Sequence, residues 1–193
     1  MKEKLEKVNK YIQEFHKCGM LQEFLGMEDS FELAVLCQYK NDKGVLVRCP
    51  HQWRVRHRAI NSILERLKGI QERIASARDF EELYKIIEEN RVPNIGDLTI
   101  YDIAVRLGYL QIPKVLPQEF VYIHAGAREG AKALYQRGLI KTKPSAIMSL
   151  QDFEILMPLK NIDRRHHHIP EFATYSMIIE NFLCVKRKDL MVL

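Results

Sequence analysis

The sequence has few cysteines, and their placement excludes several kinds of site. Cys18, Cys37, Cys49 and Cys184 are scattered along 193 residues without a C-x-x-C pair, so the spacing of a zinc knuckle or a dithiol redox motif is missing. A disulfide framework is typical of much smaller secreted chains. We therefore expect reduced thiols, no metal site and no cofactor.

Long apolar runs and the common catalytic signatures are also missing. No run approaches the ~18 apolar residues of a membrane-spanning helix, and the start, MKEKLEKVNKY, is too charged for the apolar core of a signal peptide. We expect a cytoplasmic protein without a membrane partner. The sequence contains no P-loop, G-x-G-x-x-G, H-E-x-x-H or G-x-S-x-G motif, and it leaves open whether the protein is an enzyme.

What is present is an ordinary globular composition with a mild basic excess. Hydrophobic residues make up 47% of the chain and charged residues 28%, which argues against disorder. The chain is long enough to bury a core of its own. Its 30 basic and 25 acidic side chains give a net charge of +5, which favours an acidic partner such as nucleic acid.

Apolar residues recur at helical spacing along most of the chain. The pattern predicts helices over 3–17, 30–40, 53–67, 79–90, 99–108 and 128–136 and a last one from Pro170, with N-caps at Ser30, Asp79 and Ser149. Only 45–47 suggests a short strand. We predict a mainly α fold with little or no β structure. It would be one compact domain of N-terminal helices (1–90), a hairpin region (91–138) and C-terminal helices (145–193).

The stretch 92–108, VPNIGDLTIYDIAVRLG, has the spacing of a tight loop that opens a helix. Asn94 and Gly96 flank the apolar Ile95, and both tolerate a positive φ. Backbone amides in such a loop, at a helix N-terminus, form a natural anion site. The competing interpretation is a helix corner that packs and binds nothing.

The helix after this loop is expected to open at a capping box of Thr99 and Asp102 and to end at Gly108. Asp97 places a carboxylate beside the proposed anion site, where its charge would repel a phosphate.

The longer segment ELYKIIEENRVPNIGDLTIYDIAVRLG resembles the helix-hairpin-helix motif. The positions that match it are Val92, Pro93, Ile95, Gly96 and Ala104. In that family the loop amides bind the DNA backbone without reading sequence, as contacts to phosphate do in general. The resemblance implies such contacts for the loop and helix start at Asn94, Ile95, Gly96 and Thr99.

DNA glycosylases, which the segment resembles in outline, add a catalytic Lys just after the hairpin and an Asp about one helix later. Leu98 stands near the Lys position, and the stretch IPKVLPQEF offers Gln118 and Glu119 but no Asp. Base-excision chemistry therefore does not carry over. Other blocks, such as HAGAREGAKAL, are similar to uncharacterised bacterial proteins, which implies no activity.

A second loop and helix, HAGAREGAKALYQRG, repeats the glycine spacing of NIGDLTIYDIAVRLG. It suggests a second hairpin in which Gly126 exposes backbone amides beside Arg128 and Lys132. The alternative is a small-residue helix face that lets another element approach closely.

The most basic helix is expected to begin at Trp53 and to carry Arg54, Arg56 and Arg58. A lone Trp at the start of an amphipathic helix is typical of a core residue, although beside two arginines it could also stack on a base. We expect the core position. The histidines 166–168 point in different directions on any regular element, so we expect a solvated loop rather than a metal site.

Together these features predict a nucleic-acid-binding protein, for DNA rather than RNA, that grips phosphates without reading sequence. The predicted binding residues are Asn94, Ile95, Gly96, Thr99, Gly126, Arg128, Lys132, Arg54, Arg56 and Arg58. Two alternatives stay open at this point. One is an adaptor or homo-oligomer that docks through its apolar C-terminal helix and tail, and the other is an enzyme acting on nucleic acid without a local signature.

Overall fold

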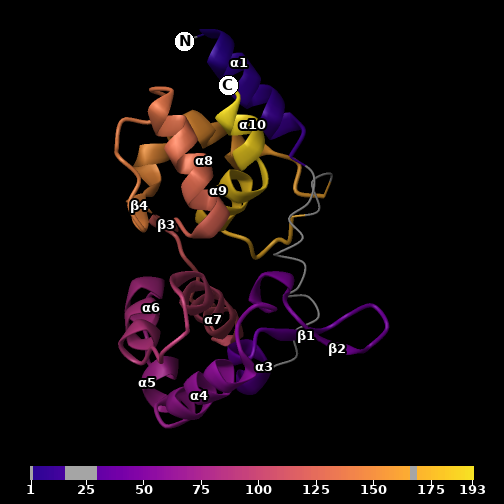
Figure 1. The fold of residues 1–193 in the computed structure, drawn as a ribbon, viewed down its shortest axis with the longest axis vertical. Helices are drawn as coiled ribbons and strands as arrows, with labels where there is room; N and C mark the ends of the chain where they lie inside the picture. Colours follow the sequence, from indigo (N-terminus) through magenta and orange to yellow (C-terminus); the bar gives the residue numbers. More distant parts are fainter. Residues whose placement is uncertain (1, 16–29, 166–168) are drawn as a thin grey trace. The chain divides into compact units, whose positions relative to one another are not determined.

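The computed structural model describes residues 2–15, 30–165 and 169–193, and helices dominate them (Figure 1). The α-helices are α1 (Lys2–Gln13), α3 (Phe31–Val35), α4 (His57–Lys68), α5 (Gln71–Ala75), α6 (Phe80–Glu89), α7 (Asp97–Leu110), α8 (Ala125–Gln136), α9 (Tyr175–Val185) and α10 (Arg187–Met191), and the 3-10 helices are η1 (Pro50–Gln52) and η2 (Leu150–Asn161). Two antiparallel ladders pair β1 (Gln38–Lys40) with β2 (Leu46–Arg48) and β3 (Phe120–Tyr122) with β4 (Ile147–Ser149). The predicted mainly α fold is confirmed.

The chain divides into two compact units. Unit 1 consists of residues 1–21 and 118–193, and unit 2 of residues 22–117. The segments of unit 1 contain 16 basic and 11 acidic side chains, whereas unit 2 contains 14 of each. The whole net charge of +5 therefore belongs to unit 1. A single domain over 1–193 stays a prediction.

Unit 1 is built around α9, of whose 11 residues eight are buried: Met177, Ile178, Ile179, Phe182 and Leu183 together with the polar Ser176, Glu180 and Asn181. α8 packs on α9 and α10, β3 and η2 also contact α9, and α1 packs on η2. The ring of Phe15, just after α1, meets Phe182 edge to face at 5.5 Å between centroids. The N-terminal helix is thereby joined to the C-terminal half of the chain.

Unit 2 is built around α7, which packs against α6 and α3. Phe80 and Tyr101 join α6 to α7 by an edge-to-face contact at 6.1 Å. Gly108 does not end this helix as predicted, because α7 continues to Leu110. A Cβ at position 108 would overlap the Val115 carbonyl oxygen, so the glycine serves the close approach of the returning chain.

The predicted N-caps are confirmed. The side chains of Ser30, Asp79 and Ser149 each accept a hydrogen bond from the first turn that follows, and Ser149 forms a capping box with Asp152. The residues that follow Ser149 form a 3-10 helix, and Pro158 lies inside it rather than at its end. None of the helices in the described ranges is long and apolar enough to cross a membrane.

Other predicted helix boundaries are also wrong. The helix expected over 30–40 ends at Val35, because Cys37 takes a positive φ of 50° and the chain turns into β1. The last helix begins at Tyr175, capped by Thr174, and not at Pro170. The basic helix begins at His57, so its predicted first turn is a separate short element. The histidine run 166–168 lies outside the described residues.

Candidate nucleic-acid interface

Three long helices begin without a side-chain cap, and predicted binding residues lie at all three. α4 begins after Arg56, α7 after Gly96 and α8 after His124, and in none of them does the N-cap side chain accept a hydrogen bond from the helix. By contrast, Asp79 caps α6 and Thr174 caps α9. An uncapped N-terminus presents unpaired backbone N–H groups and the positive end of the helix dipole, which together favour an anion.

The N-terminus of α4 is surrounded by positive charge. Arg56 is the N-cap and Arg58 lies in the first turn, which contains no acidic residue. Cations at this end oppose the helix dipole, by about 0.3–1 kcal/mol each at the surface. Arg54, Arg56 and Arg58 are exposed, and none forms an ion pair with an acidic residue of the described chain. A bound phosphate would relieve this repulsion.

Trp53 stands next to these arginines and is exposed, which contradicts the predicted core position. Its side chain is 67% exposed because the basic helix starts four residues later, at His57. The Arg54 guanidinium lies over the indole, 5.0 Å from the ring centroid. The sequence analysis expected a core residue, and the alternative of a base-stacking ring stays a prediction.

A buried polar cluster fixes the element that precedes Trp53. The Gln52 amide, at 1% exposure, donates to the Asp102 carboxylate and accepts a hydrogen bond of 2.8 Å from the Thr99 hydroxyl. Farther along α7, the Arg106 guanidinium donates to the Cys49 sulfur at 2.6 Å. These bonds tie η1 to α7. Nothing in the local sequence around Gln52 signals this role.

The same cluster corrects the prediction for Thr99. α7 starts at Asp97 with Gly96 as its N-cap, so Thr99 and Asp102 lie inside the helix and form no capping box. Both side chains are buried and point to Gln52 instead. Among the predicted residues, Thr99 thus links the α7 N-terminus to the segment that carries the three arginines.

The loop between α6 and α7 has the tight backbone that its sequence predicts. Asn94 is exposed with a φ of 68°, in the left-handed region, and Ile95 is buried beneath it. Gly96 has a φ of −89°, so the positive φ allowed to it is not used. The arrangement of two packed helices joined by this loop is present, while a helix-hairpin-helix role in DNA binding stays a prediction.

Arg91, which sequence reasoning overlooked, clamps this loop. Its guanidinium lies 2.6 Å from the Glu88 carboxylate and 2.7 Å from the Asp97 carboxylate, and it also donates to the Ile95 carbonyl at 3.5 Å. Burial alone would lower the pKa of Arg91, but its hydrogen bonds to the two carboxylates raise it above the ordinary value. Asp97 therefore has a compensating charge.

The glycines of α8 serve packing. A Cβ at Gly130 would overlap the Leu183 carbonyl oxygen, and one at Gly126 would lie 2.8 Å from the Cys184 sulfur. The small-residue face is therefore what allows α8 to approach α9 closely. The strand β3 precedes α8, so this region is not a second helix-hairpin-helix.

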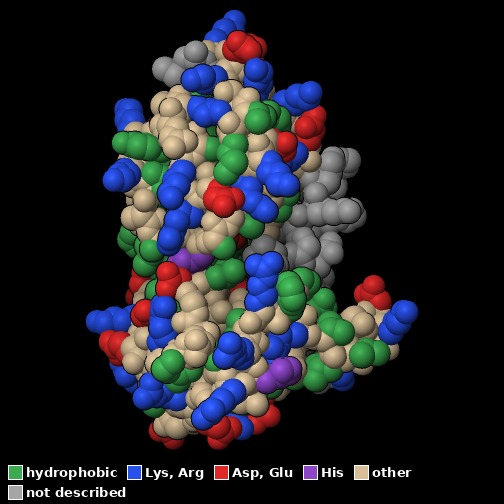
Figure 2. All heavy atoms as spheres, in the orientation of Figure 1, with side chains coloured by type: hydrophobic (Ala, Val, Ile, Leu, Met, Phe, Trp, Pro, Cys, Tyr) green, Lys and Arg blue, Asp and Glu red, His purple; other side chains and the backbone are tan. Residues whose placement is uncertain are grey.

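The cations of α8 are nevertheless available. Lys132 is exposed and Arg128 half-buried, and within the described ranges neither is paired with an acidic residue. Arg187 of α10 lies 3.2 Å from the Glu129 carboxylate. Figure 2 shows Lys and Arg side chains gathered over α8 and α10, in the unit that carries the net charge.

The predicted residues fall into two groups, one in each unit. Unit 2 holds Asn94, Ile95, Gly96, Thr99, Arg54, Arg56 and Arg58, and unit 1 holds Gly126, Arg128 and Lys132. Each group includes an uncapped helix start and cations without an acidic partner in the described chain.

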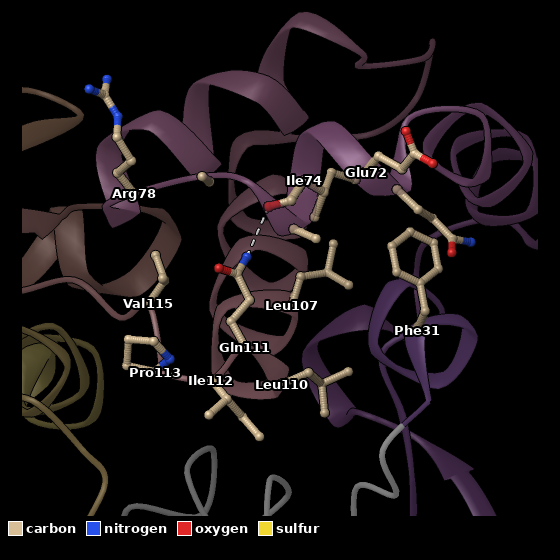
Figure 3. A pocket seen from close by; sticks show the side chains of 13 residues that line it. Phe31, Glu72, Ile74, Arg78, Leu107, Leu110, Gln111, Ile112, Pro113 and Val115 are labelled. Atoms are coloured by element: carbon tan, nitrogen blue, oxygen red, sulfur yellow. Dashed lines mark hydrogen bonds between the residues drawn. The ribbon is translucent and has the colours of Figure 1, made fainter.

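Unit 2 also contains an apolar pocket of about 780 Å³ (Figure 3). Apolar side chains from α3, α5, α7 and the loop after α7 line it, and Ile112 in that loop is 98% exposed. The Gln111 amide in the pocket wall donates a hydrogen bond of 3.0 Å to the Ile74 carbonyl. Arg78 at the rim is already paired with Glu82 at 3.0 Å. This lining suits an apolar group better than a phosphate.

The C-terminal helix and tail are used inside unit 1. The apolar side chains of α9 are buried there, and Leu190 of α10 is buried as well. The Arg137 guanidinium donates to the Leu193 carbonyl at 2.8 Å. Of the terminal apolar residues, Val192 at 75% exposure is the one most open to solvent.

A comparison with known families decides the relationship. Residues 5–189 match the model described as the 5-hmdU DNA kinase, helical domain. The protein belongs to this family. The match spans both units, and the description of the family is that of a helical, DNA-related domain. No curated protein and no solved structure matches the chain.

Proposed function

We propose that the protein is a DNA-binding helical module of a DNA-modification system, and that it holds the DNA backbone for a kinase acting on 5-hmdU. The observation that carries the proposal is the family match over residues 5–189, in a family named for a 5-hmdU DNA kinase. The sequence contains no P-loop motif. In this proposal phosphoryl transfer therefore belongs to a separate kinase domain or polypeptide.

The uncapped helix starts and the cations beside them support binding through phosphates. Arg54, Arg56 and Arg58 would hold the backbone at the N-terminus of α4, and Arg128 with Lys132 would do so on α8. Backbone amides and guanidinium groups that contact phosphates position a protein on DNA without reading its sequence. Recognition of the modified base would then come from the kinase.

Binding can be tested by fluorescence anisotropy with labelled duplexes over a salt series. One duplex carries thymine and the other 5-hmdU at the same positions, and we expect equal affinity for both. Each phosphate neutralised should contribute roughly 0.9 to the slope of log K against log salt. The triple variant R54Q/R56Q/R58Q and the double variant R128Q/K132Q should each lower that slope.

The matched control is R73Q/R78Q. Its two arginines are also exposed but are paired with Glu89 and Glu82, so the control should bind DNA nearly as the unaltered protein does. Absence of measurable duplex binding at low salt would overturn the proposal. So would an equal loss of affinity in the control and in the two test variants.

A further inference from the structure

We propose that Trp53 forms a stacking site for an unpaired nucleobase, with Arg54, Arg56 and Arg58 on the phosphates that flank it. This site rests on the proposed function and adds a preference for one state of the DNA. The protein would bind unpaired or extruded nucleotides more tightly than the same nucleotides in an intact duplex.

The first support is the exposure of a large aromatic ring among cations. Trp53 is the single Trp of the chain, and 67% of its side chain is open to solvent. An uncovered Trp ring leaves a large apolar surface in contact with water, which is unfavourable. Arg54 lies over the ring at 5.0 Å, and Arg56 and Arg58 follow without acidic partners in the described ranges. A ligand that is flat, aromatic and joined to anions fits this combination.

The second support is the anchoring of the backbone that carries the ring. Trp53 directly follows η1, which is held on both sides by buried residues. On one side the Cys49 amide donates to the Cys37 carbonyl at 2.9 Å, and on the other the Gln52 side chain bonds to Thr99 and Asp102. A preorganised surface of this kind loses little conformational entropy when a ligand binds.

The backbone after Trp53 is fixed as well. The Val55 amide donates to the Gln52 carbonyl at 3.1 Å. The Arg48 guanidinium donates to the Val55 carbonyl at 3.0 Å and to His57 Nδ1 at 3.2 Å. The ring is therefore held on a turn with buried anchors, and its exposure is a property of the fold.

The third support is the state of DNA that such a ring can contact. In a duplex, neighbouring base pairs cover both faces of every base, so stacking on a protein ring requires a base outside the stack. Proteins of this kind accept any base, because every base has a π face. Enzymes that do chemistry on a base generally work on single strands or extrude the base from the duplex, which is the state that this site would hold.

The single Trp makes a direct experiment possible. Fluorescence excited at 295 nm reports Trp53 alone. It can be followed during titration with three DNAs of one sequence: a single strand, a complete duplex, and a duplex with one unpaired nucleotide. We expect strong quenching by the single strand and by the duplex with the unpaired nucleotide, and little by the complete duplex.

Affinity is measured in parallel by anisotropy of the labelled DNA. W53A should weaken single-strand binding by roughly 5- to 150-fold, the range that corresponds to stacking on an aromatic side chain. W53F should retain most of the affinity, and W53A should lose much less affinity for the complete duplex than for the single strand. Y135A, which removes an exposed aromatic ring from unit 1, is the matched control and should have no effect. Circular dichroism melts should be unchanged for W53A, because the ring is exposed.

The outcomes separate the two proposals. DNA binding without quenching of Trp53, and with an unaltered affinity in W53A, would overturn the stacking site and leave backbone binding intact. Equal quenching by the complete duplex would overturn the preference for unpaired bases. Absence of binding to all three DNAs would overturn the proposed function itself.

Discussion

The Arg91 guanidinium lies 2.7 Å from the Asp97 carboxylate, across the loop that joins α6 to α7. The contact closes a loop that carries one exposed left-handed residue, Asn94, and one buried anchor, Ile95. It also offsets the one negative charge in the first turn of α7. The stability of the loop and its suitability for phosphate thus depend on the same ion pair.

A double-mutant cycle over R91A and D97N should give a coupling free energy of about 0.5–1 kcal/mol. The value is modest because both side chains are partly exposed and water screens the pair. Urea unfolding of the single and double variants measures it. The more exposed pair Arg73–Glu89 is the control, and its coupling should be smaller. An Arg91–Asp97 coupling near zero would mean that the loop does not depend on this pair.

Asp97 also offers a test of phosphate binding at the loop. If the amides near Asn94 and Gly96 contact DNA, D97N should raise duplex affinity at low salt by roughly fivefold, since it removes a repulsion of about 1 kcal/mol. R91A should lower affinity, because it leaves the carboxylate uncompensated. Unaltered affinity in both variants would assign the loop to packing alone. The measurement is the salt-series anisotropy titration.

G130A should destabilise unit 1 by roughly 3 kcal/mol or more, because the new methyl group would overlap the Leu183 carbonyl and push α8 away from α9. G69A is the matched control, since the nearest atom to its new Cβ is an ordinary 3.6 Å away. Thermal melts of the two variants test the difference. A G130A melt equal to that of the unaltered protein would contradict the close helix contact.

T99V should cost roughly 1–3 kcal/mol. The substitution keeps the shape of the side chain but leaves the buried Gln52 amide oxygen without the hydroxyl that donates to it. Urea unfolding measures the loss, and S62A, which removes an exposed hydroxyl bonded to the Arg58 carbonyl, is the control. If Thr99 acts only through the stability of unit 2, the apparent DNA affinity of T99V should fall only in proportion to the fraction of the protein that is folded.

Y175F should be neutral or slightly stabilising at neutral pH. Within the described chain the buried Tyr175 hydroxyl has no hydrogen-bond partner, and removal of such a group relieves its desolvation cost. Burial raises the pKa of Tyr175 to about 12. The folded state therefore keeps this proton longer than the unfolded chain, and stability should fall as the pH rises from about 10 to about 12. Y175F should show a shallower fall in chemical unfolding over that range, and an identical fall would contradict the shifted pKa.

Local patterns predicted part of this structure correctly, for a physical reason. Capping needs only a side-chain oxygen and the amides two or three residues ahead, so Ser30, Asp79 and Ser149 could be identified without knowledge of the rest of the chain. The positions of Trp53 and Thr99 could not. Both depend on the buried bonds between Gln52 and α7, which join residues about 50 positions apart.

The candidate site was predictable in its charges and not in its geometry. Arg54, Arg56, Arg58, Arg128 and Lys132 stand out as a basic excess in the sequence, and the structure describes them without acidic partners. Arg91 was missed because its partner Asp97 lies six residues away, across a loop whose path is set by the packing of α6 on α7. The glycines of α8 have the spacing expected of a loop, but their role is to allow close packing. The spacing of glycines in the sequence does not distinguish these two roles.

The contact of Phe15 with Phe182 has a consequence for the order in which the chain folds. Unit 2 is continuous in sequence and is inserted between the two segments of unit 1. During synthesis unit 2 can complete its contacts before the strands and helices that follow residue 117, which α1 needs as partners, have been made. Closure of such a long-range contact is slow compared with local helix formation. On the ribosome, the inserted unit should become protected from proteases first, and the N-terminal helix should become protected only once α9 has emerged.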